Sequence, residues 1–330
     1  MHEIYKLTLS QLSGLLTDLQ SDTVFGHLCW RMKEIYGDDI LNEFLNLYKN
    51  NNPVFTISDN LFEKENKVYF PKPIYSISLN KDKTDLIKAE KLKLMCEYKQ
   101  IKNVKFIDTE TLNLFLKGDI DEYYKKLLNS ENIKTFDDSL RTNVQINRET
   151  LSAMEGRLFS YSPKYLNSNF EKNEQKVNIC FLIKKFNEQE FEYFHCEELL
   201  KEVFDTGFGK KKSSGYGQFK VEGGLTEYDK IHEPNNSNGF LNLSNYLPSN
   251  EDGITDYYYD YHVKYGKLGE QYAQSENPFK KPIIFFKPGS CFKTKDPKDW
   301  YGRCTNEKEI SDYKEVIQNG CAFTLKAKIG

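Results

Sequence analysis

Residues 207–217 have the sequence GFGKKKSSGYG and hold four of the chain's 19 glycines. Glycine lets backbone N–H groups approach an anion without a Cβ in the way, and the lysines and serines add charge and hydrogen-bond donors. A phosphodiester backbone needs this combination. We therefore predict that this glycine-rich loop binds phosphate groups through Gly207, Gly209, Lys210, Lys211, Lys212, Ser213, Ser214, Gly215, Tyr216 and Gly217. A solvated hairpin that uses glycine only for its turns is the alternative.

The segments on both sides of the loop have the periodicity of strands and helices. Apolar residues alternate over 177–183, which predicts a strand, and a short apolar pair at 191–193 predicts another. The three-and-four spacing of apolar residues over 196–204 predicts a helix. Alternation resumes directly after the loop, where residues 219–221 predict a further strand.

The N-terminal segment is predicted to be a strand followed by two helices. Residues 5–9 alternate as a strand with one buried face. The side-chain oxygens of residues 21–23 are expected to cap a helix whose apolar stripe runs over 24–35. A second stripe over 40–48 predicts another helix, which the Asn-Asn-Asn-Pro of 50–53 ends.

Between about residues 60 and 176 the pattern is irregular and far too long for a simple loop, which indicates an insertion or accessory element. The resulting order, β-α-(insertion)-β-α-β, resembles a ferredoxin-like unit. The fold class is therefore α+β.

A domain boundary is expected at residues 223–238, which concentrate Gly, Pro, Asn and Ser. It separates an N-terminal domain, residues 1–222, from a mostly β domain, residues 223–330. Alternating apolar residues predict strands of the second domain near 241–247, 257–265, 283–286 and 321–329.

The first predicted helix carries a second candidate contact surface, formed by Phe25, Gly26, His27 and Arg31. Glycine inside a helix costs roughly 1 kcal/mol against alanine, so we expect the glycine-rich loop or an RNA backbone to approach Gly26 closely. His27 and Arg31 lie four residues apart and share a helix face. A structural, hydrogen-bonded histidine is the alternative for His27.

The irregular region contains a third candidate, RTNVQINRET at residues 141–150. Its alternation predicts an exposed β-hairpin arm. Arginines interleaved with Asn and Thr suit contacts to a nucleic-acid backbone, and the predicted contacts are Arg141, Asn143, Asn147, Arg148 and Thr150. The alternative is an ordinary solvated edge strand, whose sequence would show a similar pattern.

Composition limits the partners and the chemistry. A net charge of −3 makes any polyanion site a local one. Seven scattered cysteines without a C-x-x-C pair encode neither a disulfide framework nor a zinc knuckle, and reducing cytoplasm is the expected compartment. No signal peptide or membrane span is expected.

The sequence offers no catalytic constellation. Its five histidines form no H-E-x-x-H pair, and no G-x-S-x-G elbow occurs. The glycine-rich loop fits neither the P-loop nor the Rossmann spacing. We predict no catalytic residue, no metal and no cofactor.

Three motifs together resemble one known family: DTVFGHLCW at 22–30, RTNVQINRET at 141–150, and GFGKKKSSGYGQF at 207–219. The chain resembles the RAMP-superfamily subunit of the type III-A CRISPR (Csm) effector that holds the 5′ handle of the guide RNA (crRNA). The resemblance implies two ferredoxin-like domains, a thumb hairpin from residues 141–150, and a glycine-rich loop against the guide RNA. Asn147 and Thr142 depart from the family's R-N-x-I-D-R-x-T-like run.

The same resemblance implies partners. Subunits of this kind cap a filament of RAMP backbone subunits and dock onto a large subunit with cyclase and DNase activities. One alternative is a repeat-processing endoribonuclease of the same superfamily that uses His27 as its general base or acid. Another is a protein-only scaffold, which would leave the lysine loop without a purpose.

Overall fold

The structure is a computed structural model that describes residues 2–75, 88–130, 133, 135–166, 177–269, 272, 274–305, 310–311, 313 and 316–330. An eight-stranded antiparallel sheet forms its centre, with the path β11-β1-β10-β3-β4-β5, β12 on β1 and β2 on β10. The strands are β1 (Ile4–Gln11), β2 (Phe55–Ile57), β3 (Leu61–Lys64), β4 (Lys67–Pro71), β5 (Phe106–Asp108), β10 (Val177–Lys185), β11 (Phe219–Val221) and β12 (Thr226–Glu227).

Strand β10 lies between two apolar cores. Ile179, Phe181 and Ile183 belong to one buried cluster, whereas Cys180 and Leu182 belong to another. Successive side chains of a strand point to opposite faces, so β10 is buried on both sides. This explains why its sequence is almost continuously apolar.

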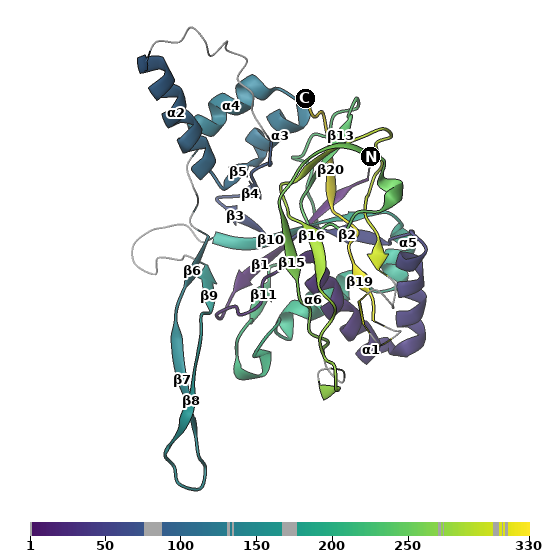
Figure 1. The fold of residues 1–330 in the computed structure, drawn as a ribbon. Coiled ribbons are helices and arrows are strands. Elements are labelled where there is room, and N and C mark those ends of the chain that lie inside the picture. The colour runs from purple at the N-terminus through teal and green to yellow at the C-terminus, as the bar shows by residue number, and fades with distance from the viewer. Residues whose placement is uncertain are drawn as a thin grey trace.

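Helices cover the sheet in two groups (Figure 1). The first group, α1 (Ser21–Lys49), α5 (Glu188–Tyr193) and α6 (Cys196–Asp205), shares the core of Ile179 and Phe181. The second group, α2 (Lys88–Asn103), α3 (Thr109–Lys117) and α4 (Ile120–Leu128), packs into the core of Cys180 and Leu182. Gly37 breaks α1 with φ 89°, at the point between the two predicted helices.

The C-terminal part forms a second sheet with the order β14-β17-β13-β20. Its strands are β13 (Gly239–Asn242), β14 (Ile254–Tyr258), β17 (Cys291–Thr294) and β20 (Thr324–Ala327). Two further pairs are β15 (Tyr261–Lys264) with β16 (Ile283–Phe286), and β18 (Cys304–Thr305) with β19 (Gln318–Asn319). Leu241 and Leu325 of the second sheet share a core with Leu182 of the first. The domain boundary at residue 222 stays a prediction, and β12 beyond it still pairs with β1.

An exposed arm, residues 141–161, projects from the body as a two-stranded hairpin (Figure 1). It consists of β7 (Arg141–Ile146) and β8 (Ala153–Tyr161), and the pair β6 (Phe136–Asp138) and β9 (Lys164–Leu166) carries it. The hairpin predicted around residues 141–150 is therefore present.

Three local predictions are wrong. The strand expected at 191–193 lies in helix α5, because the Asn187 side chain accepts the Glu190 N–H and caps a helix there. The single strand expected over 257–265 is divided between β14 and β15, which belong to different sheets. Residue 20 and not 21–23 is the N-cap position of α1, and its side chain makes no capping bond. Within the region from 60 to 176, where an insertion or accessory element is expected, β3, β4 and β5 extend the central sheet.

Within the residues that the structure describes, no helix has both the length and the apolar character needed to cross a membrane.

Candidate nucleic-acid interface

The backbone of the glycine-rich loop needs its glycines. Gly207, Gly209, Gly215 and Gly217 all have positive φ, between 66° and 90°. A Cβ on Gly217 would lie 2.0 Å from the Phe208 carbonyl oxygen, and one on Gly209 would lie 2.4 Å from the Thr17 side chain. The left-handed region and these close approaches both favour glycine. The loop is a tightly packed turn and not an open one.

Most of the glycine N–H groups are used inside the protein. Gly207 donates to Phe204 (3.2 Å), Gly215 to Lys212 (3.1 Å) and Gly217 to Gly14 (2.9 Å), in each case to the carbonyl oxygen. The prediction that these three N–H groups approach an anion is therefore wrong. Exposed side chains remain for that purpose, and they are Lys210, Lys211, Ser213 and Ser214, with Lys212 and Tyr216 half-buried.

The loop rests on a link segment, residues 12–19, between β1 and α1. The Lys210 N–H donates to Thr17 Oγ1 at 2.8 Å, and the Gln218 N–H donates to Ser13 Oγ at 2.9 Å. The sequence did not predict contacts of Ser13, Gly14 and Thr17 with the loop. Their only signal was their place in the short link between a predicted strand and a predicted helix.

The base of the arm contacts the loop directly. The Tyr161 and Tyr216 hydroxyl oxygens lie 3.0 Å apart, and their rings meet edge to face with centroids 5.5 Å apart. The Lys211 ammonium lies 3.6 Å from the centre of the Tyr161 ring and 5.0 Å from that of Phe159. A cation over an aromatic face is attracted by the ring quadrupole. The hydrogen bond with Tyr216 and the nearby Lys211 charge lower the pKa of Tyr161.

The arm has two different faces. Arg141 pairs with Tyr161 and Asn143 with Phe159, so these four side chains share one face. Lys211 lies against that face. The opposite face carries Thr142, Val144, Leu158 and Ser160. The face with Arg141 and Asn143 therefore adjoins the glycine-rich loop.

The predicted residues near the arm's tip lie apart from this cluster. Asn147 Oδ1 accepts the N–H groups of Glu149 (2.8 Å) and Thr150 (3.4 Å), so Asn147 shapes the turn. The Thr150 and Ser152 hydroxyls are 2.8 Å apart, and Arg148 is exposed. Arg157, exposed on β8, was not among the predicted residues, because the motif used for the prediction ends at Thr150.

Helix α1 meets the loop at His27 and not at Gly26. The His27 and Phe208 ring centroids lie 4.6 Å apart. Apart from the helix's own backbone, no heavy atom of the described chain lies within 4 Å of a Cβ placed on Gly26. The expected approach of the glycine-rich loop to Gly26 is therefore wrong. Gly26 leaves an open position beside His27.

Two other predicted residues of α1 make contacts within the protein. The Phe25 side chain is 3% exposed and packs against Phe44 and Tyr48 in the core, so its side chain has no surface for RNA and leaves the candidate set. Arg31 forms ion pairs with Glu34 and, at 3.8 Å, with Glu202. These two carboxylates offset the positive charge of Arg31, which would otherwise attract a phosphate group.

The glycine-rich loop is thus the centre of the candidate interface. Lys211 and Tyr216 connect it to the arm, and Phe208 connects it to α1. In the described part of the chain, no group of three or more His, Cys, Asp and Glu side chains is placed to hold a metal ion. The chemistry that the surface offers is hydrogen bonding, positive charge and aromatic stacking.

Comparisons with known proteins agree with this architecture. No curated protein matches the sequence. A chain of the crystal structure of a Csm1–Csm4 cassette in complex with pppApA has the same fold, with 16% identity, a TM-score of 0.60 and 99% of each chain covered. A chain of the crystal structure of a Csm3–Csm4 subcomplex of the type III-A CRISPR-Cas interference complex is similar, with 17% identity and a TM-score of 0.60. That match covers 98% of this chain and 99% of the other.

The family comparison is more specific than the shared fold. The model of the RAMP superfamily matches residues 12–220, which is more than half of the chain. The matched range includes the link segment, α1, the arm and the glycine-rich loop. This chain belongs to the RAMP superfamily.

Proposed function

We propose that this chain is a crRNA-binding subunit of a type III-A CRISPR (Csm) effector and that it holds the 5′ handle of the guide RNA. The observation that carries the proposal is the contact of the glycine-rich loop with both other predicted RNA-binding motifs. Lys211 lies 3.6 Å from the centre of the Tyr161 ring on the arm, and Phe208 lies against His27 of α1. Three motifs from distant parts of a RAMP chain thus form one surface.

Each part of this surface has a proposed role. Lys210, Lys211, Ser213 and Ser214 are exposed and bind backbone phosphates. Gly26, beside His27, admits the RNA backbone into open space. Arg141 and Asn143 extend the contact along the arm, where the half-exposed Phe159 ring offers a base a stacking surface. Asn147, Arg148 and Thr150, near the tip, act in a thumb that reaches over the bound strand.

Two protein partners are part of the proposal. Chains of the same fold come from complexes named Csm1–Csm4 and Csm3–Csm4, which supports contacts with a large subunit and with a backbone RAMP subunit. The large subunit is the one with the cyclase and DNase activities. We place this assembly in the cytoplasm.

The proposed role is not catalytic. His27, the general base of the alternative endoribonuclease function, packs its ring against Phe208. The sequence also contains no H-E-x-x-H pair and no G-x-S-x-G elbow. Purified protein should leave repeat RNA and target RNA intact, with and without divalent metal. Cleavage that is lost in His27→Ala would establish the endoribonuclease function instead.

The binding part of the proposal is tested with a labelled guide RNA that carries the handle and with one whose handle is scrambled. We expect tighter binding of the intact handle and an affinity that falls as salt rises, because phosphate contacts release counterions. A chain that joins the effector but shows no salt-sensitive affinity for either RNA would be a protein-only scaffold.

A further inference from the structure

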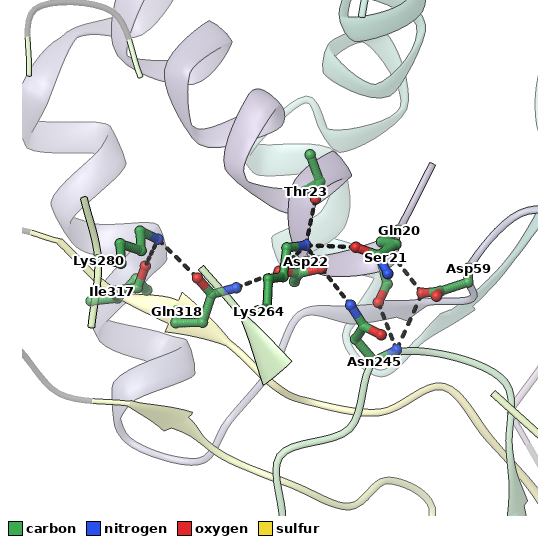
Figure 2. Close-up of polar contacts among 10 residues, drawn as sticks. All are labelled: Gln20, Ser21, Asp22, Thr23, Asp59, Asn245, Lys264, Lys280, Ile317 and Gln318. Atoms are coloured by element: carbon green, nitrogen blue, oxygen red, sulfur yellow. Dashed lines mark hydrogen bonds and ion pairs between the residues drawn. The ribbon is translucent and has the colours of Figure 1, made fainter. Parts of the chain in front are cut away.

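A buried polar cluster joins the start of α1 to four distant parts of the chain. Its members are Gln20, Ser21, Asp22, Thr23, Asp59, Asn245, Lys264 and Gln318, and we call it the junction cluster (Figure 2). None of these residues was predicted to bind RNA.

Asp22 is the centre of the cluster. Its side chain is 2% exposed, and its carboxylate accepts from Lys264 Nζ at 2.7 Å, from Asn245 Nδ2 at 2.8 Å and from Gln318 Nε2 at 2.6 Å. The three donors come from the C-terminal part of the chain. A buried carboxylate with this many donors is stable only while they stay in place, because its charge is costly without them.

Lys264 connects the C-terminal part to both sides of the helix start. Besides Asp22, its ammonium donates to Gln20 Oε1 at 2.9 Å and to Thr23 Oγ1 at 2.8 Å. Gln318 is held in turn by Lys280 Nζ, which donates to its Oε1 at 2.9 Å (Figure 2). Strand β15 therefore holds the turn that leads into α1.

Two residues that contact the glycine-rich loop, Thr17 and His27, lie on either side of this turn in the sequence. Thr17, which accepts the Lys210 N–H, lies three residues before Gln20. His27, which packs against Phe208, lies five residues after Asp22 on the same helix. A shift at Asp22 would therefore move both residues.

A second contact holds the C-terminal part to α1. A Cβ on Gly269 would lie 2.9 Å from Trp30 Nε1, so the backbone after β15 lies directly against the helix. The Tyr272 ring is 6.1 Å from the Trp30 ring. The segment that begins at Lys264 thus touches α1 both before and after His27.

We infer that Asp22 and Lys264 are positioning residues for RNA binding, through which the C-terminal part of the chain sets the placement of the glycine-rich loop. They act without touching RNA. The inference rests on the proposed function, since it assumes that the loop binds RNA.

The test compares Lys264→Met with Lys287→Met in the full chain. Lys287 also forms an ion pair at 2.7 Å, with Asp260, but that pair is exposed and lies outside the cluster. Both variants lose one positive charge, the first from β15 and the second from the residue that follows its partner strand β16. We expect Lys264→Met to bind handle RNA about tenfold more weakly, as if about a tenth of the molecules kept a competent loop, and Lys287→Met to bind as wild type does.

Two further readouts separate positioning from direct contact and from general instability. The salt dependence of binding should be the same in Lys264→Met and wild type, because no phosphate contact is removed. Hydrogen exchange should rise over residues 12–19 and 207–217 but not over α3 and α4. Lys264→Arg, which keeps the charge, should recover most of the affinity.

The outcomes are distinguishable. If wild type does not bind handle RNA, or if Lys210→Ala with Lys211→Ala binds as wild type does, the proposed function fails. If those controls behave as expected and Lys264→Met binds as tightly as Lys287→Met, the inference is overturned. Should Lys264→Met not fold, Gln318→Leu, which removes one uncharged donor to Asp22, decides by the same affinity and exchange criteria.

Discussion

The Tyr216 hydroxyl in the glycine-rich loop lies 3.0 Å from the Tyr161 hydroxyl at the base of the arm. The two residues are 55 positions apart in the sequence. Their contact, together with Lys211 over the Tyr161 ring, makes the loop and the arm one surface. A change in the loop is therefore expected to affect the arm, and a change in the arm to affect the loop.

The first prediction concerns the coupling of loop and arm. Tyr216→Phe and Tyr161→Phe each remove the shared hydrogen bond and keep the edge-to-face ring contact. Each variant should lower the free energy of unfolding by about 0.5 to 1 kcal/mol, as expected for a partly solvated hydrogen bond. In a double-mutant cycle the second substitution should add little to the first, because both remove the same bond. Strict additivity would mean that the hydroxyls do not interact in solution.

The second prediction concerns the lysines of the loop. Lys210→Ala with Lys211→Ala should weaken binding of handle RNA and reduce the slope of log K against log salt by about 1.4, since each single-strand phosphate contact contributes about 0.7. The matched control is Lys125→Ala with Lys126→Ala. It removes the same charge from exposed positions on α4. An unchanged slope in the loop variant would favour the solvated-hairpin alternative.

The third prediction concerns the arm. Arg141→Ala with Arg148→Ala removes two exposed charges without touching the core, so the chain should still fold and join the effector. The nucleotide beside the handle should restack, because unstacking a base costs a few kcal/mol and the contacts that offset it are lost. A fluorescent base analogue at the junction of handle and guide, read in the assembled complex, measures this.

The control for the arm lies on its other face. Val144→Thr with Leu158→Thr changes the side that does not carry Arg141, and should leave the base-analogue signal as in wild type. Equal signals from wild type and the double-arginine variant would show that the arm does not act as a thumb.

The fourth prediction is a pH dependence of stability at the junction cluster. Asp59 Oδ1 accepts the Ser21 N–H at the start of α1, and burial raises the pKa of Asp59 to about 7. Between about pH 4 and pH 7 the unfolded chain has lost this proton while the folded chain keeps it. The free energy of unfolding therefore falls as pH rises through this window, by at most about 1.4 kcal/mol per pH unit.

Asp59→Asn cannot titrate and removes this contribution. Relative to wild type, the variant should gain about 2 kcal/mol of stability between pH 5 and pH 7. Denaturant unfolding at both pH values measures the difference, and Asp138→Asn, at an exposed position, should show no such trend. A wild-type–variant difference that is constant with pH would contradict the raised pKa.

The spacing of apolar residues correctly predicted those strands and helices that show a single regular period along their length. The alternation of residues 5–9 and 177–183 gave β1 and β10, and the spacing over 196–204 gave α6. Periodicity failed at residues 191–193, because Asn187, two residues after the end of β10, caps a helix there and outweighs the two aromatic residues. It also failed at 257–265, because alternation does not show that the chain changes sheets between Tyr258 and Tyr261.

The candidate site was predicted in part. The glycine-rich loop, the arm and His27 meet in the structure, although their sequence positions alone did not place them together. Phe25 was misplaced: it lies three residues from Leu28 on the apolar side of α1, and its side chain is buried in the core. The junction cluster could not be predicted from the sequence. Lys264 lies 242 residues from Asp22, and polar residues that far apart show no shared pattern.

The most direct test of the account is photocrosslinking of handle RNA, with 4-thiouridine in the handle, to the chain in the assembled effector, followed by mapping of the linked peptides. We predict crosslinks in residues 207–217 and near His27, and their loss from the loop peptide in Lys210→Ala with Lys211→Ala. Crosslinks confined to other surfaces, such as α2 to α4 or the C-terminal sheet, with the loop unlabelled, would contradict the central claim that the glycine-rich loop holds the handle.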